Sequence, residues 1–192
     1  MKGEWCYFKN FFDKNYCDNL LQKIKARPYQ EATIGLSGGN IGKDDSFRRS
    51  NIRFVLQDDP ELNHVFKDLW QLALWANKDW FNFHISKLDY YQIAEYDESY
   101  RGEYKRHIDV FWMNEDPLHH RKLSCIVQLT DPNQYEGCDL EFYDTTFVPD
   151  RDELRGLGTV IFFPSVIPHA ATPITKGTRY SLAAWFDGPK WR

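Results

Sequence analysis

After residue 84, short segments rich in β-branched and aromatic residues alternate with turn-forming residues along the rest of the sequence. Segments of this length, without helical periodicity between them, are typical of an antiparallel sandwich or barrel. We therefore expect a mostly β core over residues 85–192. Its predicted strands cover residues 86–96, 102–112, 122–130, 138–143, 158–163, 168–173 and 178–186.

Two amphipathic helices are expected before this core. Residues 13–26 carry one apolar stripe, and Asp13 precedes it as a helix N-cap. A second helix is expected over residues 59–77, with Asp59 as its N-cap. We expect both helices to pack on the outside of the β core, so that residues 1–84 form a helical and β support for it.

The composition favours one soluble domain over residues 1–192. Aromatic residues make up 17% of the chain, which indicates a packed globular protein. Lys and Arg number 24 against 28 Asp and Glu, so no nucleic-acid partner is expected. No apolar run reaches the ~18 residues of a membrane span, and the four cysteines lack C-x-x-C spacing. We therefore expect a cytoplasmic protein without a membrane partner.

The glycine-rich stretch GLSGGNIGKDD, residues 35–45, resembles a phosphate-binding loop only in part. Ser37 stands where that motif requires its first glycine, and Asp44 replaces the Ser or Thr that follows the lysine. We interpret the stretch as a surface loop. Residues 35–47 could act as a lid over a site in the β core.

His107 and Asp109 are unusual in a segment otherwise suited to a core strand. Their spacing places both side chains on one face of a strand, ~7 Å apart along the chain. His169 lies between two other predicted strands, and antiparallel pairing can bring it beside the first two. Two imidazoles and one carboxylate form the facial triad of non-haem Fe(II) oxygenases. The same ligand types also bind catalytic zinc, so these residues leave the metal open.

Arg179 and Ser181 share one face of the last predicted strand, ten and twelve residues after His169. A charge near a metal pocket is costly to bury unless an anion meets it. A guanidinium with a neighbouring hydroxyl suits the distal carboxylate of a dicarboxylate ligand.

Most of the chain resembles the Fe(II)- and 2-oxoglutarate-dependent oxygenases of the prolyl 4-hydroxylase-like group. The matching motifs are HID at 107–109, KLSCIVQLTDPNQYEGCDLEFY at 122–143, GTVIFFPS at 158–165 and PHAATPITKGTRYSLAAWF at 168–186, with looser matches in FRRSNIRF at 47–54 and QIAEY at 92–96. The resemblance implies a double-stranded β-helix (jelly-roll) core. It also implies Fe(II), 2-oxoglutarate and O₂ as cofactor and co-substrates, with ascorbate as a candidate stimulant.

The resemblance also implies roles for individual residues. His107, Asp109 and His169 would bind iron. Arg179 would bind the C5 carboxylate of 2-oxoglutarate, supported by Ser181. Tyr96 and Gln92 would line the co-substrate pocket. Two departures, Cys138 where relatives often have a glycine and Arg106 where many have an aromatic residue, lie off the triad and bear on the substrate.

The expected activity is hydroxylation of an unactivated C–H bond, with a prolyl residue of a peptide or protein as substrate. The alternatives are a hydroxylase of a free amino acid or small metabolite, a zinc-dependent hydrolase, and a non-catalytic binding module on the same fold. A nucleic-acid dealkylase would want a second arginine six residues after Arg179, where this chain has Trp185.

Three further residues near the triad are interpreted as structural. The polar segment 113–121 contains His119 and His120, which we expect in a surface loop; a role at the entrance to the cleft is the alternative. Trp112 continues the strand face opposite to the ligands, so we expect it in the core.

Overall fold

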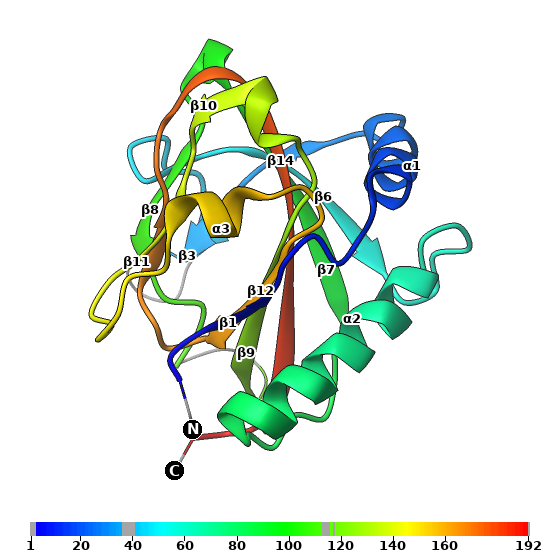
Figure 1. Cartoon of the computed structure of the whole chain (residues 1–192), viewed down its shortest axis with the longest axis vertical. Coiled ribbons are helices and arrows are strands. Elements are labelled where there is room, and N and C mark those ends of the chain that lie inside the picture. The colour runs from blue at the N-terminus through cyan, green and yellow to red at the C-terminus, as the bar shows by residue number, and fades with distance from the viewer. Residues whose placement is uncertain (1–2, 36–40, 113–115, 117, 192) are drawn as a thin grey trace.

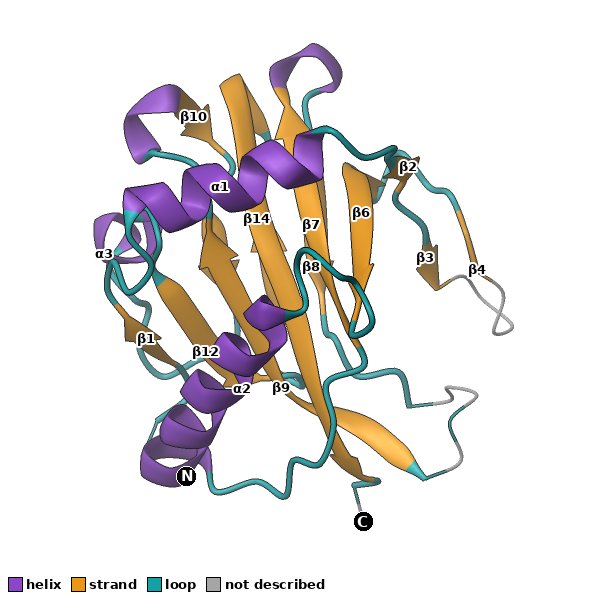
Figure 2. Cartoon of the chain, turned by 90° about the vertical axis from the view of Figure 1, so that its right-hand side faces the viewer, coloured by secondary structure: helices purple, strands orange, loops and turns teal. Residues whose placement is uncertain are grey.

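The computed structural model describes residues 3–35, 41–112, 116 and 118–191. Two antiparallel sheets form the core of this part of the chain, which confirms the mostly β prediction (Figure 1). Helices α1 (Lys14–Lys25) and α2 (His64–Ala76) lie on one face of the larger sheet, as Figure 2 shows. No helix in the described ranges is long and apolar enough to cross a bilayer.

The larger sheet has its longest strand near the middle. Its order is β1 (Cys6–Phe8), β12 (Val160–Pro164), β9 (His119–Gln128), β14 (Ile174–Pro189), β7 (Tyr90–Asp97), β6 (Asn51–Leu56) and β2 (Gln30–Glu31), and β10 (Tyr135–Gly137) also pairs with β14. Strand β14 therefore joins two halves of the sheet that come from distant parts of the sequence.

The smaller sheet is made of short strands. Its order is β11 (Leu140–Phe142), β13 (His169–Ala171), β8 (Glu103–His107) and β5 (Arg48–Arg49), and β3 (Ile34–Gly35) pairs separately with β4 (Ile41–Gly42). Each of the seven predicted strand segments thus contains a strand. The short strands of the N-terminal half were not predicted one by one, because segments of two or three residues carry no periodicity.

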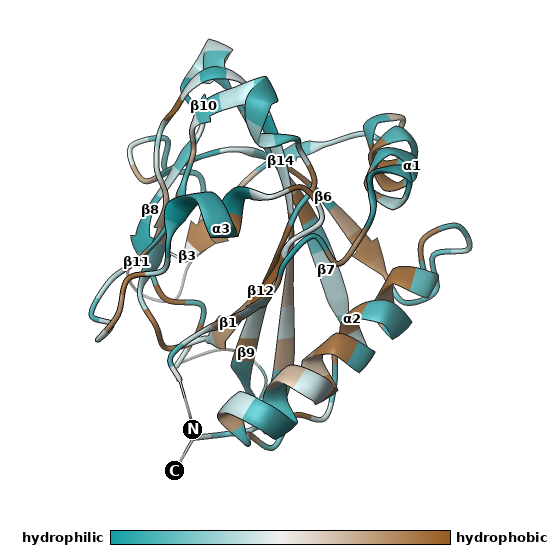
Figure 3. Cartoon of the chain, in the orientation of Figure 1, coloured by the Kyte–Doolittle hydropathy of each residue, from teal (hydrophilic) through white to brown (hydrophobic). Residues whose placement is uncertain are grey.

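Several helical turns interrupt the β core, although no helix was expected there. Helix α3 (Arg151–Arg155) lies between β11 and β12 and begins where the Asp150 carboxylate accepts from the backbone N–H of Asp152. The 3₁₀ turns are η3 (Glu98–Tyr100) and η4 (Pro132–Gln134). In Figure 3, α3 is largely hydrophilic, whereas hydrophobic residues concentrate on the larger sheet and on parts of α2.

The N-terminal helices differ in how well their starts were predicted. Asp13 caps α1, and its carboxylate accepts from the N–H of Tyr16 at 2.8 Å. The second helix begins at His64, so its predicted start was wrong: Asp59 instead accepts from the N–H groups of Glu61 and Leu62 and closes a separate turn. Helix α2 continues into the π-helical turn η2 (Asn77–Phe81).

Strand β14 separates the two layers of the interior. On one face Leu182, Ala184 and Phe186 are buried in the core that the helices cover. Burial of one such large side chain stabilises the fold by ~1.5–3 kcal/mol. Because strand side chains alternate, Arg179, Ser181 and their neighbours face the opposite way, toward the smaller sheet.

Two local interpretations near the end of β8 were wrong. Trp112 is 53% exposed, because β8 ends at His107 and the alternation of a strand does not continue to it. His119 and His120 begin β9 instead of lying in a loop, and His120 is buried. The predicted lid over residues 35–47 includes residues 36–40, which lie outside the described part of the chain.

Candidate active site

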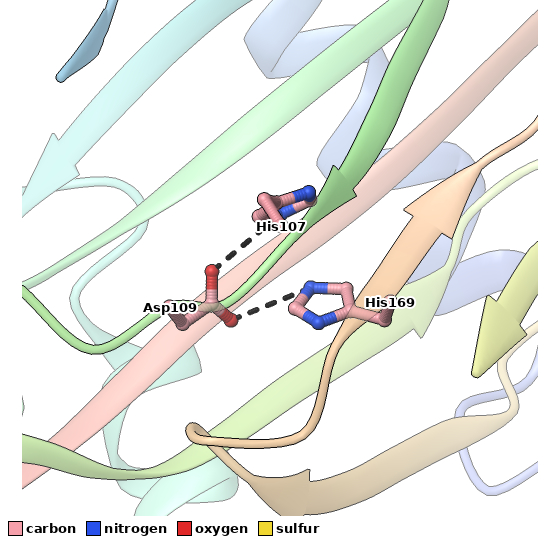
Figure 4. A group of neighbouring side chains, drawn as sticks. All are labelled: His107, Asp109 and His169. Carbon is pink, nitrogen blue, oxygen red and sulfur yellow. Dashed lines mark ion pairs between the residues drawn. The ribbon is translucent and has the colours of Figure 1, made fainter. Parts of the chain in front are cut away.

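Two histidines and one aspartate converge between the two sheets (Figure 4). His107 ends β8, and His169 begins β13 directly opposite it in the strand register. The His107 Nε2 atom lies 3.7 Å from Asp109 Oδ1, and His169 Nε2 lies 3.5 Å from Asp109 Oδ2. The three ligand atoms lie within 4.8 Å of one another, so a single metal ion can contact all three.

Each imidazole is oriented by a backbone carbonyl two residues before it. His107 Nδ1 lies 2.7 Å from the carbonyl oxygen of Lys105, and His169 Nδ1 lies 3.0 Å from that of Ile167. Since a carbonyl can only accept, Nδ1 carries the proton and donates in both rings. The Nε2 lone pairs are thereby left facing each other and the aspartate, as metal ligation requires.

Asp109 is fixed by its own backbone and by two serines. Its N–H donates to the carbonyl of Ser165 at 2.9 Å, and Ser124 Oγ donates to its Oδ2 atom at 2.6 Å. The hydroxyls of Ser124 and Ser165 lie 2.9 Å apart. The contact of Ser124 with the site was not predicted from the sequence, although its polar side chain inside an otherwise apolar predicted strand was a usable signal.

The electrostatics keep His107 and Asp109 in the forms that bind metals. Burial lowers the pKa of His107, and the neighbouring His169 lowers it further, so the ring is neutral at neutral pH. Burial raises the pKa of Asp109, but His169, His107 and the Ser124 hydroxyl lower it more, and the net pKa falls below its usual value. Neutral imidazoles and an ionised carboxylate are the forms that bind divalent cations. The donor set therefore fits Fe(II).

The triad opens onto one pocket between the sheets. All seven residues singled out in the sequence line it, namely His107, Asp109, His169, Arg179, Ser181, Tyr96 and Gln92. The pairing of β14 with β7 brings Arg179, Tyr96 and Gln92 to the same pocket. In this register Arg179 lies opposite Tyr96, and Ala183 lies opposite Gln92. Arg48, Ile126, Leu140 and Trp185 also line the pocket.

Arg179 is a buried cation with only neutral partners in the described ranges. Its side chain is 2% exposed, and its Nε and Nη2 atoms donate to Gln128 Oε1 at 3.1 and 2.9 Å. Burial lowers its pKa, but Cys138, Tyr135 and Tyr96 raise it above the usual value, so the guanidinium stays charged. A buried charge without a counter-ion is unstable unless an anion joins it. A ligand carboxylate therefore fits this end of the pocket.

Gln128 is a second residue that the sequence analysis missed. It lies on β9 opposite Ser181, on the same strand face as Ser124 and Ile126. The spacing of Ser124 and Gln128, with polar side chains four residues apart on one face of a buried strand, was the available signal.

Comparison with known proteins gives one family. The sequence model of the 2OG-Fe(II) oxygenase superfamily matches residues 91–187. A PKHD-type hydroxylase of Aliarcobacter butzleri is 30% identical over 176 residues, which cover 89% of this chain and 71% of the relative.

Two solved structures have a similar fold. A Pseudomonas putida prolyl-4-hydroxylase superposes with a TM-score of 0.71 at 19% identity, over 96% of this chain and 92% of that one. A Trichoplax adhaerens prolyl hydroxylase, solved with a peptide fragment of the hypoxia inducible factor oxygen degradation domain, has a TM-score of 0.73 at 18% identity, over 96% and 83% of the two chains. At these identities the likeness is one of fold alone.

Proposed function

The chain belongs to the 2OG-Fe(II) oxygenase superfamily, and from that premise we propose that it hydroxylates a prolyl residue in a peptide or protein. The reaction would use Fe(II), 2-oxoglutarate and O₂. We further propose that residues 1–192 act as one catalytic domain, with the jelly-roll core of residues 85–192 holding the site and residues 1–84 supporting it.

The buried and uncompensated charge of Arg179 is the observation that supports 2-oxoglutarate as the co-substrate. This charge is almost fully buried at one end of the pocket, with an amide oxygen and a thiol as its partners in the described part of the chain. The C5 carboxylate of 2-oxoglutarate would supply the missing anion. In a zinc hydrolase of similar shape, the buried Arg179 charge would have no anionic ligand to bind.

The other pocket residues have distinct proposed roles. His107, Asp109 and His169 would hold Fe(II), while Ser181 would support the co-substrate carboxylate beside Arg179. Tyr96 and Gln92 would form the wall of the co-substrate pocket; burial raises the Tyr96 pKa, so its phenol stays protonated. When bound, Fe(II) would supply the reaction of O₂ with 2-oxoglutarate, in which one oxygen atom enters succinate with loss of CO₂ and the other enters the C–H bond. The chain itself orients the ligands and keeps water out of the buried end.

The prolyl substrate rests on likeness to other proteins. Two structures of similar fold are named as prolyl hydroxylases, and one of them was solved with a peptide. Pocket residues of this chain fit the co-substrate, but none of them identifies a proline ring. A free amino acid or another small metabolite is therefore the competing substrate class.

Succinate formation tests the reaction class. Purified protein with 2-oxoglutarate should form succinate only when Fe(II) is present, and ascorbate is tested as a stimulant in the same assay. Absence of succinate with every substrate offered would favour a non-catalytic binding module. A panel of proline-containing peptides and free amino acids is then examined by mass spectrometry for the gain of one oxygen atom. Oxygen in a small metabolite but in no peptide would contradict the prolyl assignment and leave the reaction class intact.

A further inference from the structure

Arg48 is a second nearly buried cation in the same pocket. Its side chain is 7% exposed, and its Nε atom donates to Ser50 Oγ at 2.9 Å. In the described ranges it forms no ion pair with a carboxylate. The remaining guanidinium N–H groups are thus available to an acceptor that enters the pocket.

The neighbouring arginines of the segment FRRSNIRF are neutralised. Arg49 lies 2.6 Å from a carboxylate oxygen of Glu103, and Arg53 lies 3.1 Å from one of Glu95. In its described part, the chain thus supplies carboxylate partners to Arg49 and Arg53, which do not line the pocket, but not to Arg48. Burial alone therefore does not explain why Arg48 has no carboxylate partner there.

A stack of planar groups connects Arg48 to the metal ligands. The Arg48 guanidinium carbon lies 4.3 Å from the centre of the Tyr104 ring, which is its partner across β5 and β8. The Tyr104 ring in turn stacks on His107, with 3.5 Å between centres and 12° between planes. The Tyr104 ring thus lies between Arg48 and the ligand His107. At this position Arg48 can be reached by a substrate carboxylate near the reacting carbon.

The charges of the described pocket residues also favour binding of a further anion. Asp109 is the only carboxylate that lines the pocket, against Arg48 and Arg179. With Fe(II) and doubly charged 2-oxoglutarate bound, the pocket would retain one net positive charge. One further anion completes the balance.

We propose that Arg48 binds a carboxylate of the substrate and so selects an acidic prolyl compound. This inference rests on the reaction class of the proposed function, hydroxylation of a prolyl compound, and holds for a peptide and for free proline alike. The carboxylate can come from an Asp side chain beside the target proline of a peptide, or from the α-carboxylate of free proline. In both cases a bidentate pair with the guanidinium provides the recognition.

The test uses two matched pairs of probes. One pair is a peptide with Asp on both sides of a proline and the same peptide with Asn; the other is L-proline and L-prolinamide. Binding to protein loaded with Mn(II) and 2-oxoglutarate, without O₂, is measured by calorimetry. The proteins are the wild type, Arg48→Met, Arg48→Lys and the control Arg49→Met, which removes an arginine that already has a carboxylate partner.

The wild type and Arg49→Met should bind the acidic member of one pair at least tenfold tighter than the neutral member of that pair. Arg48→Met should bind both members of the pair equally. Arg48→Lys should retain part of the preference, because it keeps the positive charge. A purely structural role of Arg48 would affect the binding of both members alike. Preference in the peptide pair or in the proline pair identifies the source of the carboxylate.

Three results would overturn the inference: no preference in the wild type, a preference that survives Arg48→Met, or no binding of any probe. Titration of 2-oxoglutarate in the succinate assay separates these from failure of the proposed function. A wild type that forms no succinate would contradict the reaction class itself, whereas a wild type that forms succinate but shows no preference for an acidic probe would contradict only the role of Arg48.

Discussion

Arg179 and Gln128 face each other across β14 and β9, and two N–H groups of the guanidinium converge on the one amide oxygen, at 3.1 and 2.9 Å. The amide fixes the orientation of the guanidinium without neutralising it. The cation is therefore held in place with its charge still available to a ligand.

Gln128→Glu should convert this arrangement into a closed ion pair. The new carboxylate would sit at hydrogen-bond distance from Arg179 and compete with 2-oxoglutarate for it. We expect the KM for 2-oxoglutarate to rise tenfold or more, or ~1.4 kcal/mol, while the melting temperature without 2-oxoglutarate is not reduced. Gln134→Glu makes the same chemical change at an exposed position and should alter neither value. An unchanged KM in Gln128→Glu would show that Arg179 does not bind the co-substrate.

Arg179→Ala should weaken 2-oxoglutarate binding by about 2–4 kcal/mol, or roughly 30- to 1000-fold, with little effect on iron affinity. The reason is that a shielded, charge-assisted pair would be lost. The co-substrate is titrated in the succinate assay, and metal content is measured separately. Lys176→Ala, at an exposed position on the same strand, serves as the control. Equal titration curves for Arg179→Ala and the wild type would rule out the co-substrate role.

Alanine at His107, Asp109 or His169 should abolish Fe(II)-dependent succinate formation and leave the fold largely intact. The three side chains would share one metal ion, and loss of Asp109 would remove the only anionic ligand among them. Metal content and circular dichroism are measured for each variant. Asp109→Asn is compared with Asp144→Asn, which changes an exposed carboxylate that pairs with Arg106. Near wild-type turnover in any of the three alanine variants would contradict the triad.

Ser124→Ala should weaken Fe(II) binding while the triad itself remains. The hydroxyl holds Asp109 Oδ2 at 2.6 Å, and loss of such a supporting partner typically costs roughly 10- to 100-fold in metal affinity. Iron titration of the apoprotein gives the value. Ser99→Ala, which removes an exposed serine hydroxyl that bonds Asp97, is the matched control. If both variants bind iron equally well, Ser124 has no role at the metal.

Asp59 should make stability fall in acid. The Arg27 guanidinium, with help from the N–H groups of Glu61 and Leu62, lowers the Asp59 pKa to about 2. A carboxyl whose folded pKa is depressed stabilises the fold fully above its unfolded pKa, near ~4, and this contribution is lost as the pH falls toward 2. Urea unfolding at pH 6 and at pH 2.5 measures the free energy. In Asp59→Asn the difference between the two pH values should be smaller; an equal difference would contradict this assignment.

The strands of the core and the HID motif at 107–109 could be predicted because both are local patterns, whereas His169 joins them only through the pairing of β13 with β8. Alternation marks each long strand. His107 ends β8 and Asp109 lies two residues beyond it, so their proximity also depends on the chain that follows the strand, where the Asp109 N–H donates to the Ser165 carbonyl. The unpaired state of Arg48 could not be predicted, since it depends on which carboxylates lie near it in space. Trp112 and His120 were misassigned for a related reason. Where a strand begins or ends depends on its hydrogen-bond partners, and β8 is shorter and β9 longer than their sequences indicate.

The position of β14 in the larger sheet has a consequence during synthesis of the protein. Both strands that flank it, β7 and β9, precede it in the chain, and so does every triad residue. A ribosome therefore releases His107, Asp109 and His169 before the strand that carries Arg179 and Ser181. Until β14 is translated and inserts, the two halves of the sheet stay apart. The pocket that the triad lines is therefore complete only after the last strand has inserted between β7 and β9.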